Sequence, residues 1–135
     1  MTEAMSETDL KKRTKVFALR ILKLVDALPK TTAGRALASQ IVRSGTSVAA
    51  NYRAACRAKS PADFIAKMGI VEEEADETLF WLELLEESGL VSVAKLTAIK
   101  QEASELIAIT VTSIKTARRN RSSHSALRIP NSALE

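Results

Sequence analysis

Four long stretches of the chain repeat apolar residues at alternating intervals of three and four, which is the spacing of an amphipathic helix. In the first stretch, Thr8 or Asp9 is a candidate N-cap. The helix is predicted to end at Leu28, because the residue before Pro29 is disfavoured in helical conformation. Its apolar seam consists of Leu10, Phe17, Ile21, Leu24 and Leu28.

The second stretch begins after Thr31 or Thr32 and is predicted to continue as one helix toward Ser60. Gly45 lies in its interior, where glycine costs about 1 kcal/mol relative to alanine, so a break at this point is the alternative. We favour a continuous helix, because a small residue allows a neighbouring helix to approach closely.

The third stretch has the clearest start signal in the sequence. Ser60 is a natural N-cap, Pro61 suits the first helical position, and Asp63 lies near the positive end of the helix dipole. The helix is predicted to end at Ser88, before Gly89. Its seam consists of Phe64, Met68, Val71, Ala75, Thr78, Leu82 and Leu85.

The fourth stretch is capped by Ser92 and is predicted to end near Arg119. Four amphipathic helices joined by short connections predict an all-α fold, an antiparallel up-down-up-down four-helix bundle of residues 9–119. The flanking segments 1–8 and 120–135 have little apolar pattern and are predicted to be flexible, the second of them basic. The seam of the fourth helix consists of Leu96, Ile99, Ala103, Leu106, Thr110 and Ala117.

Small and hydrogen-bonding residues form a stripe on the second helix, which is predicted to be partly buried against the third. Residues that face each other across this hairpin should have numbers that sum to roughly 120, if both helices keep their register. The pairs predicted by this rule are Arg43 with Glu77, Ser47 with Glu73, and Asn51 with Gly69. We expect the Arg43 guanidinium to lie inside the bundle between Glu73 and Glu77. The predicted polar network consists of Gln40, Arg43, Ser44, Ser47, Asn51, Glu73 and Glu77.

The composition favours helix, and the cysteine content indicates the cellular compartment in which the protein is expected. Hydrophobic residues make up 46% of the chain and aromatic residues only 4%. The single cysteine, Cys56, excludes an internal disulfide framework and is expected to be unreactive, which fits a protein of the reducing cytoplasm. The chain begins without the apolar region of a signal peptide and has no apolar run of membrane-spanning length, so no membrane partner is expected.

Charge is distributed unevenly along the chain. Residues 10–60 contain twelve Lys and Arg against one acid, whereas residues 61–88 contain nine acids against one Lys. Basic residues on the first helix and in the C-terminal segment are candidates for binding the phosphates of RNA or DNA, by backbone and shape rather than by base stacking. The alternative is a solvated face without a ligand. The candidates are Lys11, Lys12, Arg13, Lys15, Arg20, Lys23, Lys115, Arg118, Arg119 and Arg121.

The acidic residues of the third helix suggest an enzymatic alternative, because clustered carboxylates can hold magnesium in all-α nucleotide pyrophosphohydrolases. The only histidine, His124, lies in the C-terminal segment, so neither a di-iron site nor a Ser/His/Asp or Cys/His catalytic site is indicated. We therefore predict no enzyme activity, no metal and no cofactor. The carboxylates are those of Glu72, Glu73, Glu74, Asp76, Glu77, Glu83, Glu86 and Glu87.

Several spaced residues resemble the bacterial four-helix-bundle proteins encoded within 23S ribosomal RNA intervening sequences. The resemblance is strong from Phe17 to Leu85 and looser in the fourth helix. One departure is Ala54, where the family often has glutamate, so a contact that needs this carboxylate is not expected. The residues that carry the resemblance are Gln40, Ile41, Val42, Arg43, Ser44, Ser47, Ala50, Asn51, Tyr52, Asp63, Phe64, Ile65, Gly69, Glu73, Glu77, Trp81 and Leu82.

The resemblance implies a homopentamer without known enzyme activity. A related bundle, the accessory variability protein of diversity-generating retroelements, works with a reverse transcriptase and RNA. The resemblance therefore implies association with nucleic acid, and structured RNA of the ribosome is one expected ligand. A protein-interaction scaffold, or an accessory subunit of a reverse transcriptase, is the alternative. Trp81 is a candidate anchor of the subunit interface, with a plain core residue as its alternative.

Overall fold

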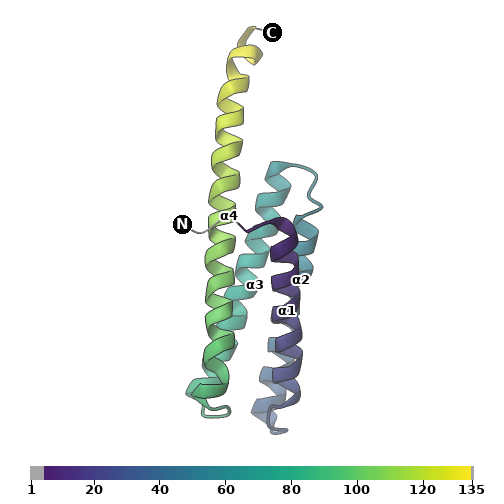
Figure 1. The fold of residues 1–135 in the computed structure, drawn as a ribbon, viewed down its shortest axis with the longest axis vertical. Helices are drawn as coiled ribbons and strands as arrows, with labels where there is room; N and C mark the ends of the chain where they lie inside the picture. The colour runs from purple at the N-terminus through teal and green to yellow at the C-terminus, as the bar shows by residue number, and fades with distance from the viewer. Residues whose placement is uncertain (1–4, 135) are drawn as a thin grey trace.

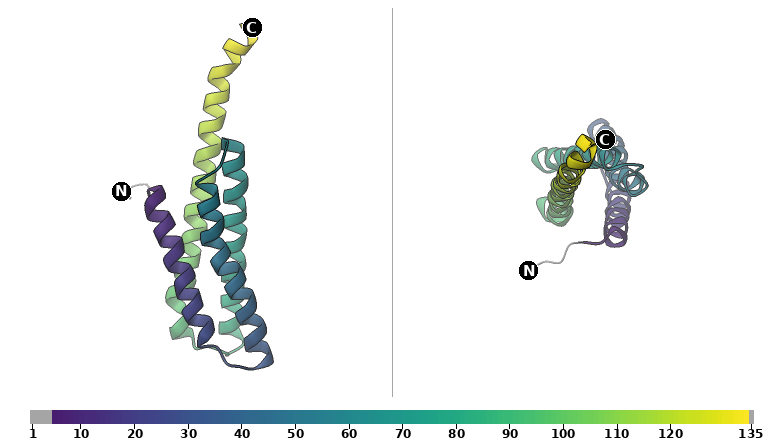
Figure 2. Two further views of the ribbon diagram at one scale, coloured as in Figure 1. Left: turned by 90° about the vertical axis from the view of Figure 1, so that its right-hand side faces the viewer. Right: turned by 90° about the horizontal axis from the view of Figure 1, so that it is seen from above.

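The computed structural model describes residues 5–134, with side chains described for residues 5–122. It confirms the predicted fold class, because four helices run alternately up and down and each packs on its neighbour in the chain (Figure 1). Of the helix pairs that contact each other, α1 and α4 do so least, and the end-on view in Figure 2 shows the bundle open on that side. The helices are α1 Glu7–Asp26, α2 Thr32–Ala55, α3 Pro61–Glu87 and α4 Val93–Leu134.

Hydroxyl side chains cap the first three helices. The Ser60 hydroxyl accepts from the backbone N–H of Asp63 at 3.0 Å, as the sequence predicts. The Thr31 hydroxyl does the same for α2. The predicted cap of α1 was wrong by two residues or more, because Ser6 takes this role and the helix begins at Glu7. Gly89, with a φ of +76°, ends α3 in the left-handed conformation that glycine tolerates best.

The end of α4 differs from the prediction. The sequence pattern ends this helix near Arg119, whereas the helix continues to Leu134 and rises above the other three in Figure 1. The apolar pattern stops where the neighbouring helices stop, but no glycine or proline occurs between Val93 and Pro130 to break the helix. The loss of pattern therefore indicated the end of packing, not the end of helix. The flexible character of 120–135 stays a prediction.

The core follows the predicted seams. Phe17 and Ile21 of α1 are fully buried, as are Met68 and Leu82 of α3. Among the seam residues only Leu24, Phe64 and Ala117 are partly exposed. Two large apolar residues of α3 outside its seam lie at the surface, since Ile70 is 42% and Phe80 is 49% exposed. The described helices include none that is long and apolar enough to cross a membrane.

Gly45 confirms the continuous second helix and the close helix approach. A Cβ at this position would lie 2.8 Å from Cγ1 and 2.9 Å from Cγ2 of Ile21, a β-branched side chain with little room to move. Gly69, by contrast, is in the middle of α3 with nothing within 4 Å of such a Cβ. The two glycines therefore offer a matched pair of substitutions.

Gly45→Ala is expected to lower the free energy of unfolding by about 1 kcal/mol, because overpacking against Ile21 outweighs the better helix propensity of alanine. Gly69→Ala is expected to raise it by about 0.5–1 kcal/mol through propensity alone. Urea unfolding of both variants measures these changes. A Gly45→Ala variant as stable as Gly69→Ala would contradict the close packing of α1 on α2.

Candidate nucleic-acid interface

The hairpin of α2 and α3 holds Arg43 against two carboxylates. The guanidinium donates to Glu74 Oε2 at 3.1 Å and to Glu77, whose carboxylate also accepts from Nε1 of Trp81 at 3.0 Å. The predicted partner Glu77 is confirmed, whereas the predicted partner Glu73 is wrong. Glu73 is exposed, and Glu74 lies on the side of α3 that faces α2. A helical repeat of 3.6 residues is not an integer, so a rule that adds residue numbers can miss by one position.

The expectation that Arg43 lies inside the bundle is also wrong. Its side chain is 48% exposed, so its ion pairs are surface pairs that contribute about 0–1 kcal/mol rather than the larger amount of a buried pair. The buried polar contact of this hairpin is one residue further along. The Thr78 hydroxyl donates to the Ser44 hydroxyl at 2.9 Å, and both residues are completely buried.

Among the described residues, neither of the remaining predicted hairpin pairs makes a hydrogen bond across the hairpin. The Ser47 hydroxyl donates to the carbonyl of Arg43 at 2.6 Å, and the Asn51 amide donates to the carbonyl of Ser47 at 2.8 Å. Both side chains thus bond to the preceding turn of their own helix. A Cβ added at Gly69 would have nothing within 4 Å. The side chain of Gln40 accepts only a long bond of 3.5 Å from Arg43.

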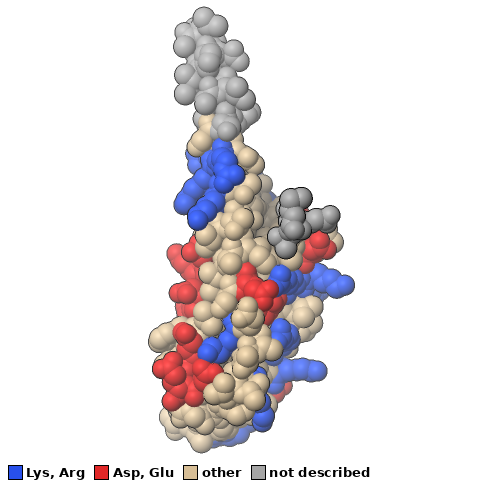
Figure 3. All heavy atoms as spheres, turned by 60° about the vertical axis from the view of Figure 1, so that its left-hand side comes forward, with Lys and Arg blue, Asp and Glu red and all other residues tan. Residues whose placement is uncertain are grey.

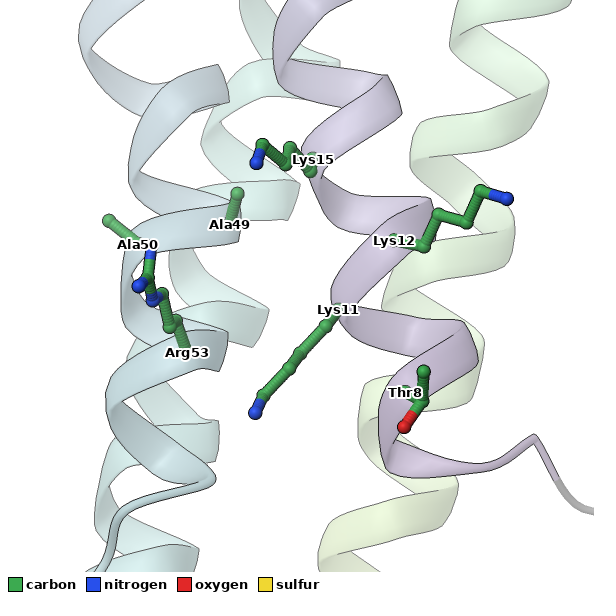
Figure 4. A pocket seen from close by; sticks show the side chains of 7 residues that line it. All are labelled: Thr8, Lys11, Lys12, Lys15, Ala49, Ala50 and Arg53. Carbon is green, nitrogen blue, oxygen red and sulfur yellow. The ribbon is translucent and has the colours of Figure 1, made fainter.

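A groove between α1 and α2 gathers positive charge. Its volume is ≈ 560 Å³, and the small side chains of Ala49 and Ala50 line it on the α2 side. Figure 4 shows Lys11 and Lys15 extending from α1 toward α2, with Arg53 on the opposite wall and Lys12 directed toward α4. The complete lining is Thr8, Lys11, Lys12, Lys15, Ala49, Ala50 and Arg53.

Arg53 is a candidate that the sequence reasoning missed. The packing of Gly45 on Ile21 fixes the antiparallel register of α1 and α2, and two turns further along α2 this register brings Arg53 beside residues 11–15. The same hairpin arithmetic about the turn between Asp26 and Thr32 would place Arg53 opposite residues 5–7, so it does not find this contact. Among the described residues, no ion pair involves Lys12, Lys15 or Arg53, and Lys11 makes one exposed pair with Glu7 at 3.3 Å.

Arg13 differs from the other predicted basic residues because it bridges α1 to α4. Its Nε and Nη2 donate to the two carboxylate oxygens of Glu102, each at 2.8 Å, and Nη2 also donates to Glu105 at 3.0 Å. The hydrogen bonds to Glu102 are the main cause that raises the pKa of Arg13. Only 24% of its side chain is exposed. This guanidinium is therefore occupied within the molecule.

The other predicted basic residues lie at the surface. Arg20 is partly exposed and Lys23 is exposed on α1. Figure 3 shows positive charge gathering on α4 just below its grey end, separated from the acidic surface lower on the molecule. The exposed candidates on this part of α4 are Lys115, Arg118, Arg119 and Arg121.

The acidic residues of α3 are distributed around the helix. Two of them pair with Arg43, and Glu86 accepts from the Lys100 ammonium at 2.7 Å, which binds α3 to α4. Within residues 5–122, no three His, Cys, Asp or Glu side chains come together as a metal site. Burial is the main cause that raises the pKa of Cys56, which disfavours the reactive thiolate.

Trp81 is partly exposed on α3 beside the exposed ring of Phe80, with ring centroids 5.1 Å apart in an edge-to-face arrangement. Its indole N–H is already used by Glu77. Trp81 is therefore neither a fully buried core residue nor a free surface residue. Its role in a subunit interface stays a prediction.

The fold and this surface define a small helical bundle with a basic groove. The part of the chain whose side chains are described forms no metal centre. The chain belongs to the 23S rRNA-intervening sequence protein family, whose model matches residues 6–112. A solved structure of a protein of unknown function, from the S23 ribosomal protein family of Bacteroides thetaiotaomicron, is similar with a TM-score of 0.72 and 34% sequence identity. That match covers 81% of this chain and 97% of the other. No curated protein matches the chain.

Proposed function

We propose that this protein is a non-enzymatic, self-associating helical bundle of the cytoplasm that binds structured RNA through basic surfaces on α1 and the upper part of α4. The observation that carries the proposal is that Lys12, Lys15 and Lys23 are exposed and make no ion pair among the described residues. Exposed cations of this kind attract phosphate without a competing internal partner.

Recognition of the backbone fits this surface better than recognition of bases. Base stacking needs exposed aromatic rings among the cations. The exposed ring of Phe80 lies on α3, between Leu79 and Trp81 on a helix that carries most of the acidic residues. The name of the family refers to a sequence within the gene for 23S rRNA, which makes ribosomal RNA a reasonable first ligand.

The intact protein is expected to bind a fluorescently labelled RNA hairpin with an affinity that falls linearly on a log–log plot as the salt concentration rises. Each phosphate contact contributes a slope of about 0.7–0.9, because contact releases a condensed counterion. Fluorescence anisotropy at several salt concentrations measures this slope. No binding at low salt would overturn the proposal, and binding that is independent of salt would contradict its electrostatic basis.

Self-association is supported by apolar residues that the monomer leaves exposed on two different helices. On α1, Val16, Leu19 and Leu22 are 46%, 55% and 43% exposed, and on α3 the residues Ile70 and Phe80 are similarly exposed. Such residues favour contacts between copies, and lysines on α1 complement glutamates on α3. The family resemblance implies a pentamer. Light scattering on the intact protein tests this, and a monomer mass would contradict it.

A protein-interaction scaffold, such as an accessory subunit of a reverse transcriptase, is the second candidate. It is favoured by a hollow of ≈ 800 Å³ that Leu10, Tyr52, Phe64 and Ile109 help to line, on the side where α1 and α4 separate. A hollow of this size, with polar residues such as Thr112, Ser113 and Asn120 beside the apolar ones, fits the side chains of a partner protein. Binding to a purified reverse transcriptase, without binding to RNA alone, would support the scaffold and overturn the first candidate.

A further inference from the structure

We infer that the groove between α1 and α2 is the phosphate-binding site of this protein, with Arg53 as one of its binding residues and Glu7 as an internal competitor for Lys11. The inference rests on the proposed association with nucleic acid and goes beyond it, because it places the contact between α1 and α2 and assigns the ligand chemistry. The ligand is the sugar–phosphate backbone, which RNA and DNA share.

The first argument is convergence of charge across the groove. Lys11 and Lys15 are four residues apart, so their Cα atoms are separated by about 6 Å along α1 and their side chains leave the same face. Figure 4 shows both extending toward α2, where the side chain of Arg53 runs along the opposite wall beside Ala50. Cations from two helices can therefore contact one strand of phosphates from both sides, whereas a single helix face offers only a row.

The second argument is the shape of the wall that receives the ligand. Ala49 and Ala50 line the groove beside Arg53, so no long side chain fills the space of ≈ 560 Å³ between the cations. A phosphate can therefore approach the helix surface, where the lower effective dielectric strengthens its attraction to each cation. The flexible stems of Lys11 and Lys15 let the ammonium groups follow a backbone of varied shape.

The third argument concerns competition within the molecule. Glu7 lies one turn before Lys11 on α1, and their charged atoms are 3.3 Å apart with both side chains well exposed. This pair neutralises one groove cation when no ligand is bound, and the ligand must displace it. Lys15 and Arg53 have no such partner among residues 5–122, so they are the stronger determinants of affinity.

The test compares two double variants of the intact protein by fluorescence anisotropy with a labelled RNA hairpin and a labelled DNA duplex. The groove variant Lys15→Gln/Arg53→Gln is expected to bind both probes about tenfold more weakly and to lower the salt slope by about 2. The control variant Arg35→Gln/Lys95→Gln removes the same charge from exposed residues at the other end of the bundle. It is expected to bind within twofold of the wild type.

The outcomes of this test distinguish binding at the groove from the more general proposal that the protein binds nucleic acid. Equal weakening by the two double variants would overturn the groove and leave only net charge as the cause of binding. Wild-type affinity in the groove variant would also overturn it, while the proposed association with nucleic acid would stand. A wild-type protein that binds neither probe at low salt would overturn both. Weakening toward only one probe would assign the groove to that nucleic acid.

Removal of the competing carboxylate of Glu7 is expected to change the affinity for the probes in the opposite direction, toward tighter binding. Glu7→Gln is expected to tighten binding about threefold, because it frees Lys11 from its pair and removes a negative charge beside the groove. Asp9→Asn removes a charge of the same sign two residues away, without an ion pair to break. A Glu7→Gln variant that binds no more tightly than Asp9→Asn would contradict the competition between Glu7 and the ligand.

Discussion

Gly34→Ala is expected to lower the free energy of unfolding by about 2 kcal/mol, although alanine is the better helix former. The new Cβ would overlap the carbonyl oxygen of Pro29 and lie 3.1 Å from Oγ1 of Thr31. Both belong to the connection between α1 and α2, which proline stiffens. The obstacle is backbone rather than the flexible end of a side chain, so relief requires the connection to move.

The same movement would break the cap of α2. The backbone N–H of Gly34 donates to the Thr31 hydroxyl at 3.1 Å, and loss of such a cap costs about 1 kcal/mol. Urea unfolding monitored by circular dichroism should show a lower midpoint with an unchanged slope. Gly69→Ala serves as the control, because it adds the same methyl group in open space. A Gly34→Ala protein as stable as the wild type would show that the connection adapts freely.

The sequence predicted the helices and their buried faces well because these depend on local rules. The spacing of Phe17 and Ile21 fixes the buried side of α1, and the Ser60-Pro61 signal fixes the start of α3. Neither requires knowledge of the neighbouring helix. The predicted end of α4 failed for the same reason, since the apolar pattern reports packing while the helix itself continues through residues 120–134.

The contacts between helices were predicted less well because they depend on rotation about the helix axis. The hairpin rule found the pair of Arg43 with Glu77 but chose Glu73 where the structure has Glu74. It also placed Asn51 on Gly69, although Asn51 bonds to its own helix. An error of one residue turns a side chain by about 100°, which is enough to move it from the interface to solvent.

The basic residues show the same limit of prediction from sequence, because their ion-pair partners depend on contacts between helices. Sequence gives the number of cations on α1 but not which of them has a carboxylate within reach on α4, a helix that lies far along the chain. Arg13 was predicted as a free binding residue and is instead held by Glu102 and Glu105. Arg53 was not predicted, and it lies on the wall of the groove. The structure therefore removes Arg13 from the candidate phosphate-binding residues and adds Arg53 to them.

Arg13→Met is expected to lower the free energy of unfolding by about 2 kcal/mol, between the small value of an exposed ion pair and the larger value of a buried one. Methionine keeps most of the apolar stem but leaves Glu102, which is only 17% exposed, without its bidentate partner. Few other contacts join α1 to α4, so this pair carries much of their attachment. Arg43→Met removes a 48% exposed guanidinium and is the matched control, with an expected loss below 1 kcal/mol.

The contribution of the contact between Arg13 and Glu105 should depend on pH in a defined direction. Hydrogen bonds from Arg13, and then from Gln101, hold the pKa of Glu105 below its ordinary value of 4.5. A carboxylate with a lowered folded-state pKa stabilises the fold above its unfolded pKa, and this stabilisation is lost as the pH falls through the folded value. The stability difference between wild type and Arg13→Met should therefore be constant above pH 4.5 and shrink below it. A difference that persists unchanged in acid would show that the effect of Arg13 does not depend on the ionised carboxylate of Glu105. If the guanidinium is occupied as the structure shows, folded Arg13→Met should bind RNA as the wild type does, because Arg13 contributes no free cation to the surface.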